Sequence, residues 1–167
     1  LRFKPALNAS QLSTDGELKI KSDEGTIQYE GFVKDGKLNG ILKTYYKSGN
    51  LANAVNYRDG AAVGKAIFYY DLEGNKIKAE MLFNEDEKMQ GEYIEYYENG
   101  EKKAVLEFDN GLPDGDALFY YDSGNKKIEG KYKKGEKEGK WVNYTEDGNL
   151  FDKEKWKKGQ TRKKTEE

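Results

Sequence analysis

A pair of adjacent aromatic residues recurs along the chain at nearly constant spacing. The pairs are Tyr45-Tyr46, Tyr69-Tyr70, Tyr96-Tyr97 and Tyr120-Tyr121, and Tyr144-Thr145 holds the next position. The steps between them are 24, 27, 24 and 24 residues. A short internal period means that one small supersecondary unit is copied along the chain and that neighbouring copies share a core. Such arrays present extended surfaces, so the period favours binding over catalysis.

Glycines mark where each copy of the unit begins. Six units open at Gly16, Gly40, Gly64, Gly91, Gly115 and Gly139. The predicted organisation is a lead-in over 1–15, repeats over 16–39, 40–63, 64–90, 91–114, 115–138 and 139–162, and a tail over 163–167. The third repeat is longer because it carries an insertion from Asn84 to Gln90. We expect tails before Asp15 and after Lys158, with disorder from Lys163 to Glu167.

The residues between the glycines are typical of hairpins. Asp35-Gly36 and Asn99-Gly100 represent two rows of turn dipeptides that tolerate positive φ. The runs between turns are short, aromatic and β-branched, as in the segment from Ile67 to Tyr70. The sequence therefore predicts an all-β fold, an elongated antiparallel β-meander of six tandem β-hairpin repeats in a single twisted sheet.

Side-chain alternation along the strands predicts two different sheet faces. One face stacks an aliphatic residue and the first tyrosine of each pair, as with Ile67 and Tyr69. We predict that the other face binds a protein partner through Tyr46, Phe68, Tyr70, Tyr93, Tyr97, Phe119, Tyr121 and Trp141. The alternative is that these aromatic side chains form the only core that a thin sheet has. A further ladder is expected to join neighbouring repeats through Val33, Tyr57, Phe108, Tyr132 and Trp156.

Charge is balanced overall but unevenly distributed. The net charge is −2, yet residues 126–164 carry seven acidic and fourteen basic residues. This basic end is a second candidate site, for anionic phospholipid, through Lys155, Trp156, Lys157, Lys158 and Arg162. The alternative is that edge lysines protect the last strand from strand addition. Interspersed acids such as Glu136 and Glu154 argue against nucleic acid as a partner.

The composition excludes several kinds of chemistry. The chain has no cysteine and no histidine, so disulfides, thiol chemistry, histidine acid–base catalysis and His/Cys metal sites are absent. The segment from Gly60 to Lys65 resembles a phosphate-binding loop, but it is one residue short and lacks the following Ser or Thr. Carboxylate pairs such as Glu92 and Glu95 lie at ordinary strand positions. We predict no enzyme activity, no catalytic residue, no metal and no cofactor.

The sequence leaves the cellular compartment open. No apolar run is long enough to cross a membrane. The chain begins at Leu1, and a removed signal peptide or a trimmed sequence would explain this equally well. Exported and cytoplasmic locations are therefore equally expected, and no oligomeric state is favoured.

The order of glycines and aromatic residues resembles the MORN repeat. The segments from Gly31 to Gly49 and from Gly130 to Tyr144 follow its scheme, and the resemblance covers Gly16 to about Arg162. The Tyr-Tyr-x-x-Gly form is similar to the bacterial variant of the repeat, the YwqK-type antitoxin-like family. The resemblance implies a scaffold for protein–protein contacts and, in some members, for phospholipid headgroups. MORN repeats also precede the catalytic domain of plant phosphatidylinositol phosphate kinases, but the resemblance here covers the repeats alone.

Overall fold

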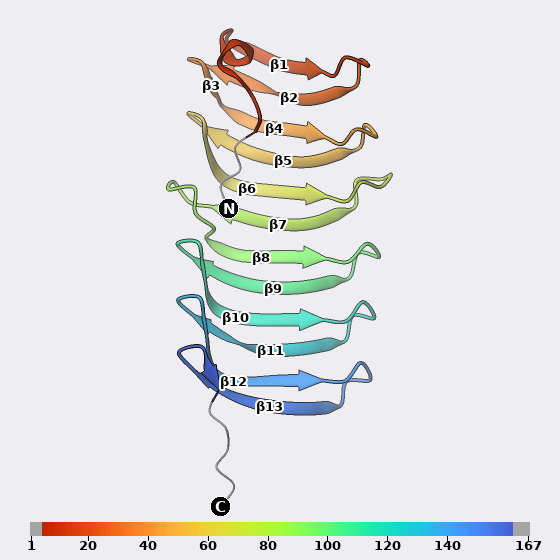
Figure 1. The fold of residues 1–167 in the computed structure, drawn as a ribbon, viewed down its shortest axis with the longest axis vertical. Coiled ribbons are helices and arrows are strands. Elements are labelled where there is room, and N and C mark those ends of the chain that lie inside the picture. The colour runs from red at the N-terminus through yellow and green to blue at the C-terminus, as the bar shows by residue number, and fades with distance from the viewer. Residues whose placement is uncertain (1–4, 162–167) are drawn as a thin grey trace, which may run out of the picture. The chain divides into compact units, whose positions relative to one another are not determined.

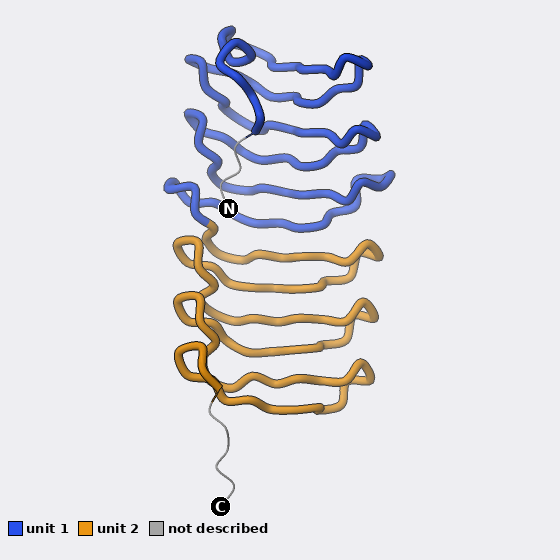
Figure 2. The backbone as a smooth tube through the Cα atoms, viewed as in Figure 1, with its two compact units in different colours: residues 1–88 blue, residues 89–167 orange. Residues whose placement is uncertain are grey.

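The computed structural model describes residues 5–161, and these form two compact units. Unit 1 comprises residues 1–88 and unit 2 comprises residues 89–167 (Figure 2). The boundary falls inside the predicted insertion from Asn84 to Gln90. There the amide of Asn84 donates to the carbonyl of Lys88, which closes a turn at the end of unit 1.

Unit 1 is a short 3-10 helix followed by an open antiparallel sheet (Figure 1). Its elements are η1 (Ala9–Leu12), β1 (Gly16–Lys21), β2 (Ile27–Lys34), β3 (Lys37–Leu38), β4 (Gly40–Tyr45), β5 (Leu51–Arg58), β6 (Ala61–Tyr69) and β7 (Ile77–Phe83). The strands are ordered β1-β2-β4-β5-β6-β7, and β3 pairs with β2. Each hairpin therefore lies beside the next one in the sequence.

Unit 2 repeats the same arrangement. Its strands are β8 (Gly91–Tyr96), β9 (Lys102–Asp109), β10 (Leu112–Tyr120), β11 (Lys126–Lys133), β12 (Glu136–Tyr144), β13 (Leu150–Lys157) and β14 (Gln160–Thr161), paired in chain order. The prediction of an all-β antiparallel meander of hairpins is confirmed in each unit. Within residues 5–161 no helix is long and apolar enough to cross a membrane.

Two segments predicted to be tails are ordered. Asn8 and Gln11 cap the 3-10 helix reciprocally, because each side chain accepts a hydrogen bond from the other residue's amide, at 3.0 and 2.9 Å. After Lys158, strand β14 pairs with β13 through Trp156–Thr161 and Lys157–Gln160. The prediction was wrong for these parts because capping and pairing give them partners. The residues from Lys163 to Glu167 lie outside the described part of the chain.

Two kinds of turn alternate, as the two glycine rows predict. In the first kind the amide of Tyr97 donates to Glu101 and the amide of Gly100 donates back to Tyr97. In the second kind two central residues have positive φ, as at Asn110 (49°) and Gly111 (85°). Positive φ at both positions matches the right-handed twist of a hairpin. This requirement explains the Asp-Gly and Asn-Gly dipeptides of the sequence.

Beyond each two-residue turn the strand is irregular. In β10, Pro113 pairs with Phe108, and pairing with β9 resumes only at Ala117.

The turns are stacked through single hydrogen bonds, since the amide of Gly135 donates to Pro113 at 2.8 Å and the amide of Gly159 donates to Lys137 at 3.1 Å. Each hairpin is therefore tied to the next at its turn as well as along its strand.

The buried core is larger in unit 1 than in unit 2. Unit 1 buries Leu18, Val33, Leu38, Leu42, Val55, Tyr57, Ala62, Val63, Ala66, Ala79, Met81 and Phe83. Among the described residues of unit 2, only Ala104, Ala117, Trp141 and Val142 are buried to the same degree. Trp141 is 1 % exposed and is the largest of the fully buried side chains. Trp141 is therefore the one large side chain that is fully buried among the described residues of unit 2.

Gly130 makes room for that indole, and this gives a first prediction. A Cβ at Gly130 would lie 2.2, 2.4 and 2.7 Å from three ring atoms of Trp141. At the equivalent Gly31 a Cβ would meet one terminal methyl of Leu42 at 2.9 Å. We expect Gly130→Ala to lower the free energy of unfolding by about 1–3 kcal/mol, and Gly31→Ala to lower it less. Equal losses in urea titrations of the two variants would contradict this account.

Candidate functional site

The pairing of strands in unit 2 gathers apolar side chains on one side of its sheet. Directly paired residues of an antiparallel sheet point to the same side. One row runs from Tyr93 through Leu106 and Ala117 to Gly130, and the next runs from Ala104 through Phe119 to Ile128. Phe108 and Tyr132 lie on the same side, opposite Gly91 and Gly115. We call this surface the aromatic face of unit 2 and define it by Tyr93, Leu106, Phe108, Phe119, Ile128 and Tyr132.

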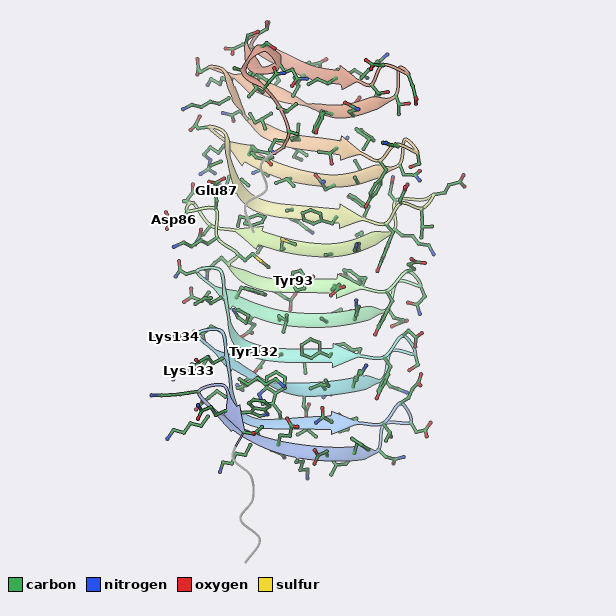
Figure 3. All side chains as sticks on the ribbon, viewed as in Figure 1. Asp86, Glu87, Tyr93, Tyr132, Lys133 and Lys134 are labelled. Carbon is green, nitrogen blue, oxygen red and sulfur yellow. The ribbon has the colours of Figure 1, made fainter. Side chains whose placement is uncertain are left out.

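The side chains of the aromatic face are half-buried and pack edge to face. The ring centroids of Tyr93 and Phe108 are 6.0 Å apart. Tyr132 packs against the buried Trp141 at 5.0 Å, and burial raises the pKa of its phenol. Figure 3 labels Tyr93 and Tyr132, whose rings lie over the strands of unit 2. Tyr93, Phe108 and Tyr132 remain partly exposed, and partly exposed aromatic side chains are enriched in protein interfaces.

In three of the pairs the second tyrosine, which lies just beyond the end of a strand, ties two hairpins together. The Tyr46 hydroxyl donates to the carbonyl oxygen of Tyr69 at 2.8 Å. In unit 2 the Tyr97 hydroxyl donates to Tyr120, and the Tyr121 hydroxyl donates to Tyr144, each at 2.9 Å. Each bond spans 23 residues, from the second tyrosine of one pair to the first tyrosine of the next pair. Tyr46, Tyr97 and Tyr121 therefore stabilise the stacking of hairpins.

Lysines cover the rings of the same row of tyrosines. Lys78 lies over Tyr70 at 5.6 Å, Lys103 over Tyr97 at 5.9 Å, and Lys127 over Tyr121 at 5.1 Å. Each of these lysines is the extra residue of a β-bulge, because pairing skips it in the register of β7, β9 or β11. The bulge aims the ammonium group at the ring, where a cation–π contact is favourable.

The predicted partner-binding residues thus divide into three groups. Phe68, Tyr93 and Phe119 lie on a sheet face. Tyr46, Tyr70, Tyr97 and Tyr121 lie just beyond strand ends, in the contacts described above. Trp141 belongs to the core, where its exposed fraction is 1 %. Its predicted place on an accessible surface is therefore wrong. The prediction also missed Leu106 and Ile128 and assigned Phe108 and Tyr132 only to contacts between repeats.

The tyrosine ties give a second prediction. Tyr121→Phe removes the hydroxyl while keeping the ring, so the carbonyl of Tyr144 loses its donor. We expect the free energy of unfolding to fall by about 0.5–1.5 kcal/mol. Tyr120→Phe is the matched control, because the second tyrosine and not the first makes this tie. A larger loss from Tyr120→Phe than from Tyr121→Phe in chemical denaturation would contradict the assigned roles.

The opposite side of each sheet carries charged groups among aliphatic ones. In unit 1 the Tyr45 hydroxyl donates to Glu30, which also pairs with Lys19 at 2.8 Å. Hydrogen bonds from Lys19 and Tyr45 lower the pKa of the Glu30 carboxyl, and burial together with Glu30 raises the pKa of Tyr45 to about 12.

Unit 2 contains a similar group. The Tyr144 hydroxyl donates to Glu129 at 2.6 Å, and Lys126 pairs with the same carboxyl at 2.7 Å. Hydrogen bonds from Lys126 and Tyr144 lower the pKa of Glu129. These carboxylates are held ionised by fixed partners, as in structural ion pairs. No group of three or more His, Cys, Asp or Glu side chains arranged to hold a metal ion occurs within residues 5–161.

The predicted basic site is distributed over both sides of β13. Trp156 is half-buried, with Lys137 over its ring at 4.5 Å, whereas Lys155 alternates to the other side and pairs with Lys140. Arg162 lies outside the described residues. Four lysines instead share two stacked turns, namely Lys133, Lys134, Lys157 and Lys158. Figure 3 shows Lys133 and Lys134 projecting from the turn between β11 and β12.

The corresponding side of the sheet in unit 1 is partly covered by the chain itself. Pro5 and Ala6 line the same hollow as Tyr29, Leu42 and Tyr57, with a volume of about 370 Å³. The covering segment continues into η1, and the Asp15 carboxylate accepts a hydrogen bond from the amide of Gly36. No such segment is found in unit 2 among residues 89–161, which consist of strands and their short connections.

Comparison with known families agrees with the repeat geometry. Residues 38–59, 89–110 and 113–134 match the MORN repeat variant. Each match begins shortly after one turn and ends in the next two-residue turn along the chain. No curated protein sequence matches the chain. Hairpins that stack in chain order, the glycine turns and the three matching segments together show that the chain contains MORN repeats of the variant type.

Proposed function

We propose that the protein is a non-catalytic scaffold that binds another protein through the aromatic face of unit 2. The observation that carries this proposal is the continuous apolar surface formed by Phe119, Ile128 and Tyr132 on adjacent strands. Glu95, whose carboxylate lies beside Ala104 at one end of the second row, is paired with Lys103 at 2.8 Å. Aromatic, uncharged patches of this kind are enriched in protein interfaces. An antitoxin that masks a toxin would be one such scaffold, as the family resemblance implies.

Two neighbouring residues allow a matched test. Phe119 and Leu118 are both half-buried in β10 and point to opposite sides of the sheet. Partners would be captured from a lysate with wild type, Phe119→Asp and Leu118→Asp, after circular dichroism has shown all three to be folded. We expect the captured partner to be lost with Phe119→Asp and kept with Leu118→Asp. Loss with Leu118→Asp alone would move the interface to the opposite side.

Binding of anionic lipid is a second candidate, supported by the two basic turns. Lys133, Lys134, Lys157 and Lys158 lie on consecutive turns joined by the Gly159–Lys137 hydrogen bond. Each lysine near an anionic surface adds about 1 kcal/mol of attraction at low salt. Flotation with phosphatidylserine vesicles should therefore weaken as salt rises and when the four lysines are changed to glutamine. Binding to neutral vesicles alone would contradict this candidate.

A further inference from the structure

We infer that the aromatic face of unit 2 accepts an extended, uncharged segment of a partner chain that carries proline beside small and aliphatic residues. This inference rests on the proposed function and names the chemistry of the partner. The model for the occupant is the protein's own N-terminal segment, in which Pro5 and Ala6 line a hollow at the corresponding face of unit 1. The repeat geometry forms this face in both units, and in unit 1 the N-terminal segment lies over it.

The two faces correspond residue by residue. In unit 1 the paired residues Leu42–Val55 and Thr44–Asn53 line the hollow beside Pro5 and Ala6. A shift of 75 residues places the paired residues Ala117–Gly130 and Phe119–Ile128 at the same positions of unit 2. Gly40–Tyr57 corresponds in the same way to Gly115–Tyr132. The register of the strands is thus the same under both surfaces.

Two of these positions become apolar in unit 2, whereas the other two become smaller, with Ala117 in place of Leu42 and Gly130 in place of Val55. Phe119 takes the place of the polar Thr44, and Ile128 takes the place of Asn53. Aromatic rings at the surface provide the flat apolar contact that proline rings favour. The apolar side chains of Phe119 and Ile128 matter because the segment of unit 1 is tethered and has a high effective concentration, whereas a partner must bind from solution.

The surroundings favour an uncharged chain. Small residues, Ala104 and Ala117, form the floor between the larger side chains, so an extended backbone can approach closely. The lysines that border this face already have partners. Lys103 pairs with Glu95 at 2.8 Å, Lys127 lies over Tyr121, and Lys137 lies over Trp141. Charged side chains in the middle of a bound segment would therefore lose water without gaining an opposite charge.

The test uses the full chain and a synthetic peptide with the sequence of Pro5–Leu12. Both tryptophans of the protein, Trp141 and Trp156, belong to unit 2, and the peptide contains none, so tryptophan fluorescence reports on unit 2 alone. We expect a saturable change in emission with a Kd below about 1 mM. Phe119→Asp should weaken binding at least tenfold, and Leu118→Asp should leave it unchanged. A peptide carrying Pro5→Asp and Leu7→Asp should not bind.

Several results would overturn the inference. One is no saturable change up to about 1 mM peptide, and another is equal affinity for wild type and Phe119→Asp. If Phe119→Asp fails to fold, Ile128→Ser replaces it with the same expectation. A dimer that dissociates in the Phe119→Asp variant would instead make the occupant a second copy of this chain. Capture of a partner through Phe119 without peptide binding would contradict this inference while leaving the proposed function intact.

Discussion

Replacing Trp141 with alanine is expected to lower the free energy of unfolding of unit 2 by about 3–5 kcal/mol. The indole is 1 % exposed, packs against Tyr132 and lies over Gly130. Its ring nitrogen donates to the carbonyl of Lys131 at 3.2 Å, and Lys137 lies 4.2 Å above the ring. The loss is large because, within residues 89–161, the other fully buried side chains are two alanines and one valine. Urea titration followed by far-ultraviolet circular dichroism measures this loss.

Two controls make the Trp141 result specific. Leu150→Ala removes an apolar side chain that is 52 % exposed, so its effect should stay within about 0.5 kcal/mol. The Gly130→Ala change should cost much less in the Trp141→Ala background, because the atoms that it would clash with are gone. Additive losses from the two changes would show that Gly130 and Trp141 are not coupled.

The second large effect is a loss of stability of unit 1 at alkaline pH. Tyr57 is 4 % exposed, and burial together with the charge of Glu87 raises its pKa to about 12. In the unfolded chain the phenol titrates near pH 10. The folded state therefore holds the proton more tightly, and its stabilisation is complete below pH 10. It is lost as the pH rises to about 12, and the two pKa units correspond to about 3 kcal/mol.

Chemical unfolding at pH 8 and at pH 11.5 tests this effect. We expect Tyr57→Phe to reduce the alkaline loss while keeping the ring in the core. Tyr45 adds a contribution of the same sign, because its pKa is also raised to about 12. The Tyr57→Phe variant should therefore retain a smaller loss. An unchanged pH dependence in this variant would show that the alkaline effect comes from other groups.

The fold could be predicted well from the sequence because each repeat contains residues that specify its turns and strands. Dipeptides such as Asp35-Gly36 and Asn110-Gly111 occur where a two-residue turn needs positive φ at both positions. The glycines of the other row close the longer turns, and the strands between alternate as expected. The regular structure of η1 and β14 was not predicted. Neither the cap formed by Asn8 nor the pairing of Thr161 follows from the repeat period of the sequence.

The candidate site was predicted less completely, for a geometric reason. Strict alternation of side chains correctly placed Phe119 on this face of the sheet. It also placed Tyr121 there, although Tyr121 lies beyond the end of β10 and ties two hairpins together. Register decides the neighbours of a face, and the pairing of Phe119 with Ile128 depends on a β-bulge at the next position. Burial likewise follows from contacts across strands, and these place Trp141 in the core.

The most direct test compares the two sides of the unit 2 sheet in solution. Ile128 lies on the aromatic face of unit 2, whereas Leu118 and Val142 lie on the opposite side of the sheet. Methyl resonances of these residues would be recorded with and without the captured partner protein. The account predicts that the Ile128 methyl signals shift while those of Leu118 and Val142 stay in place. Shifts confined to Leu118 and Val142 would contradict it.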